Sequence, residues 1–197
     1  NPFRELHYPK TLTRPKKYEA LTYGEICLLR TAAARKGDDL LVRYIDIARF
    51  TGVRLSEIGA LTSASIEFID GIACFRVRSD AKTVASANRL IPISKSLQSL
   101  VDLTDLDMRN SARAIGKRFG RLKRLGLQGG NSRSKCFHSI RKFVVTTLEQ
   151  AGISEGIAAD LVGHEKPNIT YSVYSNGSSI AQLRQAISAL DRAQSGS

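Results

Sequence analysis

The sequence lacks the features that mark several classes of protein. It has no tryptophan, one methionine and only three cysteines in 197 residues. The cysteines are an odd number, lie far apart and form no Cys-x-x-Cys pair, which argues against a disulfide scaffold or a zinc knuckle and favours a reducing compartment. No apolar run is long enough to cross a bilayer, and the beginning does not resemble a signal peptide. We therefore expect a globular, cytoplasmic protein with no membrane partner.

Acidic residues are also scarce. The chain has 18 Asp and Glu against 30 Lys and Arg, a formal net charge of +12. A positive excess indicates attraction to a polyanion when the charge is concentrated in one region. The stretch from Arg109 to Lys142 has eleven basic residues and no acidic residue. This distribution favours nucleic acid as the partner over a merely solvated charged face.

Within this stretch, the segment from Ser111 to Gly126 has the pattern of a helix with one apolar and one basic face. Ser111 suits the N-cap, and Gly126 suits the C-terminal end. The apolar spacing predicts a buried stripe made of Ala112, Ile115, Phe119, Leu122 and Leu125. The basic stripe and the cations that follow it are predicted to bind DNA, and they are Arg113, Lys117, Arg121, Arg124, Arg133 and Lys135.

The rest of the chain is mostly helical in pattern. Residues 1–17 hold three of the five prolines and are interpreted as an arm or linker. Thr22 and Glu25 fit a capping box that opens a helix toward Gly37, and Asp38 or Asp39 can cap a second helix. A short helix is predicted over 57–61. Later helices are predicted over 96–101, 138–151, 154–162 and 179–192.

A small sheet interrupts the helices. Two β-rich runs, 66–69 and 72–77, flank the pair Asp70-Gly71, which favours a tight hairpin turn. A third strand is predicted over 89–93. The expected fold class is therefore α+β, mainly helical, with a small three-stranded antiparallel sheet.

Cofactor motifs are missing. The sequence has no GxxxxGK[ST] loop and no GxGxxG after a strand, so neither ATP nor a dinucleotide is indicated. His164-Glu165 has no second histidine four residues on, and the other carboxylates are dispersed. We expect no cofactor and no metal.

Three short motifs carry groups able to act on a phosphate. His138 and Arg141 lie three residues apart, so on a helix they share a face. Arg54 follows a glycine turn in Thr-Gly-Val-Arg-Leu-Ser-Glu, and His164 ends Leu-Val-Gly-His. Two guanidinium groups could neutralise the charge that develops on a phosphodiester under attack.

In this order, with the hairpin between them, these motifs resemble the catalytic domain of tyrosine recombinases, the phage-type integrases, from Thr22 to Gly177. The resemblance implies their fold and a site-specific recombinase or integrase that cleaves and rejoins DNA through a 3′-phosphotyrosyl intermediate, without metal or ATP. Glu57 is similar to the acidic residue of the family that supports the first arginine. The catalytic residues implied are Arg54, Lys82, His138, Arg141, His164 and Tyr174.

The roles implied are distinct. Arg54 and Arg141 bind the nonbridging phosphate oxygens, His138 acts as the base, and His164 donates a hydrogen bond to the phosphate. Lys82, in the loop before the third strand, protonates the leaving 5′ oxygen, and Tyr174 is the nucleophile.

The sequence departs from the family pattern in two places. Leu161-Val162-Gly163-His164 has an extra residue in a box that usually reads Leu-Gly-His. The ten residues from His164 to Tyr174 are one more than the commonest spacing, which leaves Tyr171 as an alternative nucleophile. The ending Tyr-Ser-Asn-Gly, found in a subset of phage integrases, favours Tyr174.

The resemblance also implies an organisation and partners. We expect an arm at 1–17, a catalytic domain at 18–178, and a C-terminal amphipathic helix and tail at 179–197 that packs either on its own domain or on a neighbouring protomer. Because the first residue is Asn1, an upstream core-binding domain is expected outside this sequence. The implied partners are double-stranded DNA, further copies in a tetramer and accessory DNA-bending proteins, in a bacterial or phage-infected cell. The alternatives are a topoisomerase-IB-like nicking enzyme and a DNA-binding module without catalysis.

Overall fold

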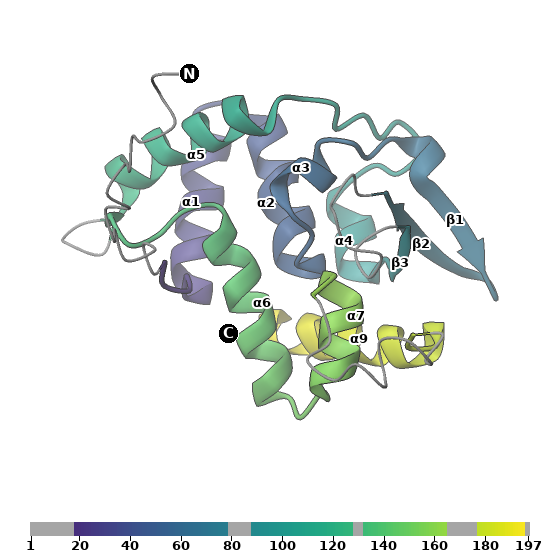
Figure 1. The fold of residues 1–197 in the computed structure, drawn as a ribbon. Coiled ribbons are helices and arrows are strands. Elements are labelled where there is room, and N and C mark those ends of the chain that lie inside the picture. The colour runs from purple at the N-terminus through teal and green to yellow at the C-terminus, as the bar shows by residue number, and fades with distance from the viewer. Residues whose placement is uncertain (1–17, 79–87, 128–131, 165–176, 196–197) are drawn as a thin grey trace, which may run out of the picture.

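The computed structural model describes residues 18–78, 88–127, 132–164 and 177–195. These ranges contain eight α-helices and a three-stranded antiparallel sheet, as the sequence predicted (Figure 1). The central helix is α2 (Asp39–Thr51), whose buried side chains include Tyr44, Ile45 and Ile47. The other long helices are α1 (Tyr23–Arg35), α5 (Ala112–Gly126), α6 (His138–Gln150) and α9 (Ile180–Ser195). The short ones are α3 (Leu55–Ile58), α4 (Lys95–Leu100) and α7 (Glu155–Val162), with a 3₁₀ turn at Ser63–Ser65.

The predicted caps of the first two helices are confirmed. The Thr22 hydroxyl accepts a bond from the Glu25 backbone N–H at 3.2 Å, and the Glu25 carboxylate accepts from the Thr22 N–H at 2.8 Å. Asp38, rather than Asp39, caps α2, since its carboxylate accepts from the Leu41 N–H at 3.0 Å. Each cap satisfies N–H groups that have no partner within the helix.

The hairpin is also confirmed. Strand β1 (Ile66–Ile69) pairs with β2 (Ile72–Val77), and β2 pairs with β3 (Arg89–Pro92), in the order β1-β2-β3. Asp70 and Gly71 both have positive φ, 51° and 75°, as the tight turn requires. In Figure 1 the hairpin projects from the side of the helical body.

Two local predictions are wrong. The short helix spans Leu55–Ile58 and not 57–61. It begins earlier because the Glu57 carboxylate accepts a bond from the Arg54 backbone N–H at 2.9 Å and closes the turn there. Leu125, predicted to be buried, is 71% exposed, and Ala112 is only partly buried, whereas Ile115, Phe119 and Leu122 are buried as predicted. In the last turn of α5 it is Gly126 that faces α1, where an added Cβ would lie 3.2 Å from the Leu28 side chain, so Leu125 points away.

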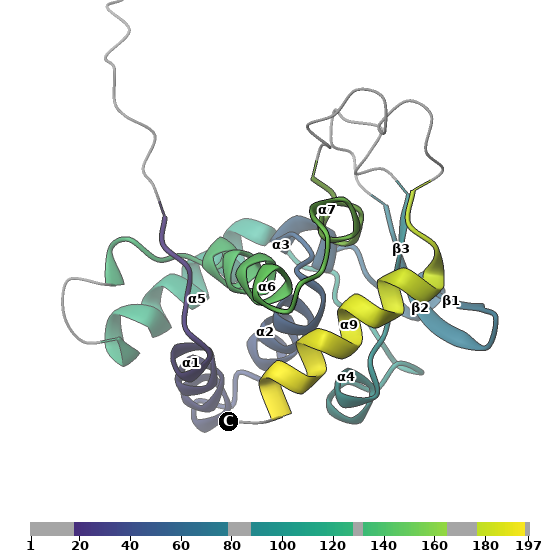
Figure 2. The ribbon, with the colours of Figure 1, turned by 90° about the horizontal axis from the view of Figure 1, so that it is seen from below.

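The last helix packs on its own chain. Seen from below, α9 crosses the molecule beside α6 and α7 and contacts both helices (Figure 2). Its apolar side buries Leu183, Ile187 and Leu190. Gln194, near its end, exchanges hydrogen bonds with Arg49, one of 2.8 Å from the guanidinium and one of 3.0 Å to the carbonyl. This packing within a single chain agrees with the first of the two alternatives for this helix.

Among the helices of these described ranges, none combines the length and the apolar character that crossing a bilayer requires.

Candidate active site

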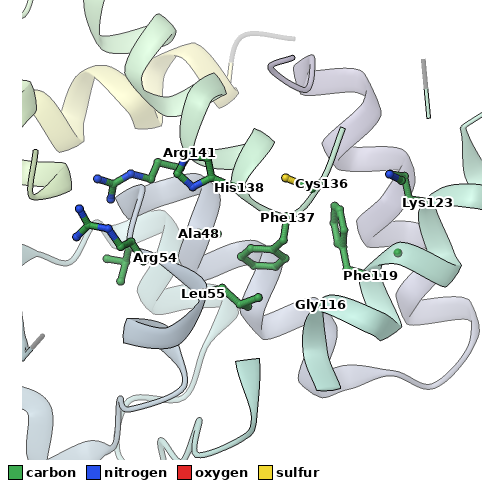
Figure 3. Close-up of a pocket in the computed structure, with 12 residues that line it drawn as sticks. Ala48, Arg54, Leu55, Gly116, Phe119, Lys123, Cys136, Phe137, His138 and Arg141 are labelled. Atoms are coloured by element: carbon green, nitrogen blue, oxygen red, sulfur yellow. The ribbon is translucent and has the colours of Figure 1, made fainter. Parts of the chain in front are cut away.

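The beginning of α6 presents His138 and Arg141 side by side. The Ser139 hydroxyl accepts a bond from the Cys136 backbone N–H at 3.0 Å, which starts the helix at His138, and Ile140 is anchored in the core. In Figure 3 the His138 ring and the Arg141 guanidinium lie next to each other on this helix, and the Arg54 guanidinium lies opposite that of Arg141. Thus two of the predicted motifs meet.

Arg54 is held from two sides. Its Nη1 donates to Glu57 Oε1 at 2.9 Å, and its Nη2 donates to the Gly163 carbonyl at 2.7 Å. Gly163 ends α7 with a positive φ of 73° and belongs to the Leu-Val-Gly-His motif. The fold therefore brings together three separate motifs, and the bond from Arg54 to Gly163 alone joins residues 109 positions apart.

Gly52 shows why the first arginine motif needs a glycine. It ends α2 with a φ of 67°, and a Cβ there would lie 2.9 Å from the Val162 side chain of α7 and 3.0 Å from the Val144 side chain of α6. The backbone can therefore approach α6 closely, and the Gly52 carbonyl accepts a bond from Arg141 Nη1 at 2.8 Å. This contact fixes Arg141 relative to Arg54.

Arg141 is buried but incompletely paired. Its residue is 3% exposed, and neither Nε nor Nη2 has a hydrogen-bond partner among the residues that the structure describes. Burial lowers the pKa of Arg141 to about 9, and the nearby charge of Arg54 adds to the effect. Buried donors without partners are costly in a folded protein. Two N–H groups aimed at one place are suited to a bound anion.

The two histidines lie in the same positive field. Both side chains are exposed at the surface, but partial desolvation, followed by the charge of Arg141, lowers the pKa of His138, and the same two causes lower the pKa of His164 to about 4. Both imidazoles are therefore neutral near pH 7 when no anion is bound. A neutral imidazole can accept a proton or donate one N–H, as a base or a phosphate ligand requires.

Arg89 also belongs to the site. From the sequence it was predicted only to begin the third strand, and no role was assigned to it. Its side chain is 7% exposed and donates from Nη2 to Glu57 Oε2 at 2.7 Å. On its own, burial raises the pKa of Glu57, but the bonds from Arg89 and then Arg54 lower it below its ordinary value. The available signal was an arginine at the start of an apolar strand, where a charged residue is unusual.

The basic face of α5 lies beside this site. Arg113, Lys117, Arg121 and Arg124 are all exposed and line one hollow of about 470 Å³. Its floor includes Gly116 and Gly120. The same two glycines line a second hollow of about 300 Å³, which Arg54, His138 and Arg141 also line (Figure 3). The basic face of α5 therefore adjoins the hollow that the paired arginines line.

The two remaining predicted DNA contacts differ from each other. Arg133 is exposed. The Lys135 side chain is 6% exposed, and its ammonium pairs with the Glu25 carboxylate at 2.5 Å. Lys135 thus ties the loop before α6 to the first turn of α1. This buried ion pair gives it a structural role, so we do not count it among the exposed cations beside the site.

Three predicted residues cannot be placed. Lys82, Tyr171 and Tyr174 lie outside the described residues, as does the arm at 1–17. In the ranges that are described, no group of three His, Cys, Asp or Glu side chains is arranged to hold a metal ion.

Comparison by sequence finds no relative. No protein-family model matches the chain, and no curated protein matches it.

Comparison by structure finds tyrosine recombinases. The catalytic core of lambda integrase matches with a TM-score of 0.56 and 21% identity, over 75% of this chain and 96% of that one. XerA recombinase matches with a TM-score of 0.55 and 17% identity over 86% of this chain, which spans 64% of XerA. A lambda integrase tetramer bound to a Holliday junction matches with a TM-score of 0.58 and 18% identity, over 78% of this chain and 47% of that one. The chain has the fold of the tyrosine-recombinase catalytic domain, which confirms the predicted fold.

Proposed function

We propose that this chain is the catalytic domain of a site-specific DNA recombinase that cleaves and rejoins strands through a 3′-phosphotyrosyl intermediate. The observation that carries the proposal is the pair Arg54 and Arg141, which the fold places face to face with two buried N–H groups of Arg141 unpaired within the described ranges. A phosphodiester has two nonbridging oxygens that such a pair can bind. The likeness in fold to integrase and Xer structures supports the same reaction class.

The arginines would supply the electrostatic part of catalysis. During attack on phosphorus, negative charge grows on the nonbridging oxygens, and planar guanidinium groups bind these oxygens with directed hydrogen bonds. Arg54 is oriented by Glu57 and Gly163, and Arg141 by Gly52. Because these contacts exist before DNA binds, little reorganisation is needed at the moment of reaction.

The remaining steps move a phosphoryl group and two protons. The phenol oxygen of Tyr174 bonds to phosphorus as the bond to the 5′ oxygen breaks, and the phenol proton passes to neutral His138. Lys82 gives a proton to the leaving 5′ oxygen, and His164 donates a hydrogen bond to the phosphate. Attack by another 5′ hydroxyl reverses these steps, so a strand is rejoined without an external energy source.

A test can be made without knowing the target sequence. The protein is incubated in EDTA with nicked duplex DNA whose core is randomised, so that cleavage releases a short strand and traps the covalent complex. We expect a denaturation-resistant adduct, with DNA attached to the peptide that contains Tyr174. Attachment to Tyr171 would reassign the nucleophile, and absence of any adduct would overturn the proposed function.

The same trapped complex separates the alternatives. We expect it to transfer its strand to an added acceptor carrying a free 5′ hydroxyl from a second duplex. A topoisomerase-IB-like enzyme would relax supercoiled DNA but would not exchange partners. A DNA-binding module without catalysis would bind the pool and form no adduct.

Oligomerisation is part of the proposal. Recombination joins strands from two duplexes, and the lambda integrase structure on a Holliday junction is a tetramer. We propose that this chain also acts as a tetramer on double-stranded DNA, with DNA-bending proteins as accessory partners.

We expect the double variant Arg121→Gln/Arg124→Gln to bind duplex DNA more weakly and with less salt dependence. Each phosphate contact contributes about 0.9 to the slope of log K against log salt, so the slope should fall by about 2. Fluorescence anisotropy over a range of salt concentrations measures both quantities.

The matched control is Arg184→Gln/Arg192→Gln on α9. These two arginines are also exposed, but α9 lies on the side of the molecule away from α5 (Figure 1). The net charge changes equally in both variants. If the control lowers the slope as much as the α5 variant does, α5 is not the DNA-binding surface.

A further inference from the structure

Arg89 contacts both of the groups that hold Arg54. Its Nη1 and Nη2 donate to the two carboxylate oxygens of Glu57, at 3.1 and 2.7 Å. Its Nε donates to the Leu161 carbonyl at 3.1 Å, in the last turn of α7 just before Gly163. The strand that begins with Arg89 is thereby joined to the helix that begins after Arg54 and to the turn that carries His164.

Gly163 fits this arrangement in a way that no other residue could. A Cβ at position 163 would lie 2.8 Å from both Cζ and Nη1 of Arg89. The guanidinium therefore occupies the space where a side chain would stand, directly against the backbone of the turn. The φ of 73° at Gly163 independently favours glycine. The glycine of the Leu-Val-Gly-His motif is required by Arg89 as well as by the turn.

Arg89 contacts both groups that accept hydrogen bonds from Arg54, namely the Glu57 carboxylate and the turn at Gly163. Arg54 donates to Glu57 Oε1 and to the Gly163 carbonyl. If Glu57 rotated, or if the turn moved, Arg54 would lose one of its two bonds. The Arg54 side chain is 33% exposed, so packing alone does not fix its position.

We infer that Arg89 is a positioning residue for the proposed cleavage reaction: through Glu57 and the turn at Gly163 it fixes the Arg54 guanidinium and the place of His164. The inference rests on the proposed function for its catalytic meaning, but the positioning itself can be measured on the protein without DNA.

The role calls for arginine rather than lysine. A guanidinium presents donors in a rigid plane and can bind both carboxylate oxygens while a third N–H reaches a carbonyl. An ammonium is a compact charge on a flexible stem and cannot match the three directions together. Arg89→Lys therefore keeps the charge beside Glu57 but loses most of the fixed geometry.

The test compares Arg89→Gln and Arg89→Lys with the wild type. Side-chain ¹⁵N relaxation of Arg54 Nε, assigned through Arg54→Lys, reports its order. In the wild type we expect an order parameter near the rigid limit of about 0.85, which falls below about 0.6 in Arg89→Gln and takes an intermediate value in Arg89→Lys. Covalent adduct formation should fall by about 100-fold in Arg89→Gln while DNA affinity changes less than threefold, with part of the rate restored in Arg89→Lys.

The matched control is Arg49→Gln. Arg49 is buried to a similar degree, with its side chain 9% exposed, and it binds Asp46 at 2.8 Å and Gln194 at 2.8 Å. Its removal should lower thermal stability about as much as Arg89→Gln does and leave Arg54 ordered. If Arg54 stays rigid in Arg89→Gln, or loosens equally in Arg49→Gln, the inference is overturned. Lack of an adduct in the wild type would overturn the proposed function alone, because the relaxation measurement needs no DNA.

Discussion

Arg141→Met is expected to reduce strand cleavage by about 10³-fold while leaving the free protein as stable as the wild type or more stable. The loss of activity follows from removing donors that face the developing charge, and one such donor contributes about 10²–10³ in rate. Arg141→Lys is expected to lose nearly as much, since a single ammonium cannot replace a planar fork.

The stability result has a separate cause. Arg141 is buried near Arg54 and Arg89, its pKa is lowered to about 9, and two of its nitrogens lack partners among the described residues. Replacing buried charge with an apolar side chain of similar volume is often neutral or stabilising by about 1–4 kcal/mol. An opposing effect comes from the Gly52 carbonyl. It loses the 2.8 Å hydrogen bond from Arg141, which lowers stability by about 1 kcal/mol.

Urea unfolding and adduct formation measure the two effects on the same sample. Arg118→Met serves as the control, because the Arg118 guanidinium is paired with the Asp38 carboxylate outside the site. We expect this control to cleave normally and to be less stable than the wild type. If Arg141→Met is strongly destabilised, Arg141 stabilises the fold and the stability prediction is wrong. If it cleaves DNA at the wild-type rate, Arg141 does not have the proposed catalytic role.

Glu57→Gln is expected to lower the free energy of unfolding by about 3–5 kcal/mol, the usual effect of breaking a buried ion pair from one side. The Glu57 carboxylate is 3% exposed and lies between Arg54 and Arg89. Without it, Arg54 and Arg89 lose the carboxylate that both of them bind, while the charge of Arg141 lies close to both. We also expect cleavage by the folded variant to fall by about 10²-fold, because Arg54 loses one of its two anchors.

The pH dependence of stability gives a second signature of this carboxylate. The pKa of Glu57 is lowered in the folded state, so its contribution is fully present above the ordinary pKa of 4.5 and is lost as the pH falls through the lowered folded value. The difference in stability between the wild type and Glu57→Gln should therefore shrink as the solution is acidified below pH 4.5.

Asp46→Asn separates lost stability from lost catalysis. Asp46 is another buried carboxylate held by two arginines, Arg30 and Arg49, each at 2.8 Å. We expect a comparable loss of stability and normal cleavage by the folded protein, measured in single turnovers at a temperature where both variants are folded. If both variants lose the same activity, Glu57 acts only on stability.

The sequence by itself determined the local elements and the reactive groups. The Thr22 capping box and the Asp70-Gly71 turn follow from short-range rules, because the hydrogen bonds involved join residues a few positions apart. Likewise His138 and Arg141 share a helix face by spacing alone. The prediction that Leu125 is buried was wrong because the helical period does not specify which side of the last turn a neighbouring helix covers.

Only the tertiary structure decided how those groups are held. The bonds from Arg54 to Gly163, from Arg141 to Gly52 and from Arg89 to Glu57 span 109, 89 and 32 residues. No local pattern specifies such pairs, since they depend on how α2, α6, α7 and β3 pack. The same packing buried Lys135 against Glu25 and left Arg121 exposed. The sequence thus determined which cations are present, while the fold decided which of them are paired and buried and which stay exposed.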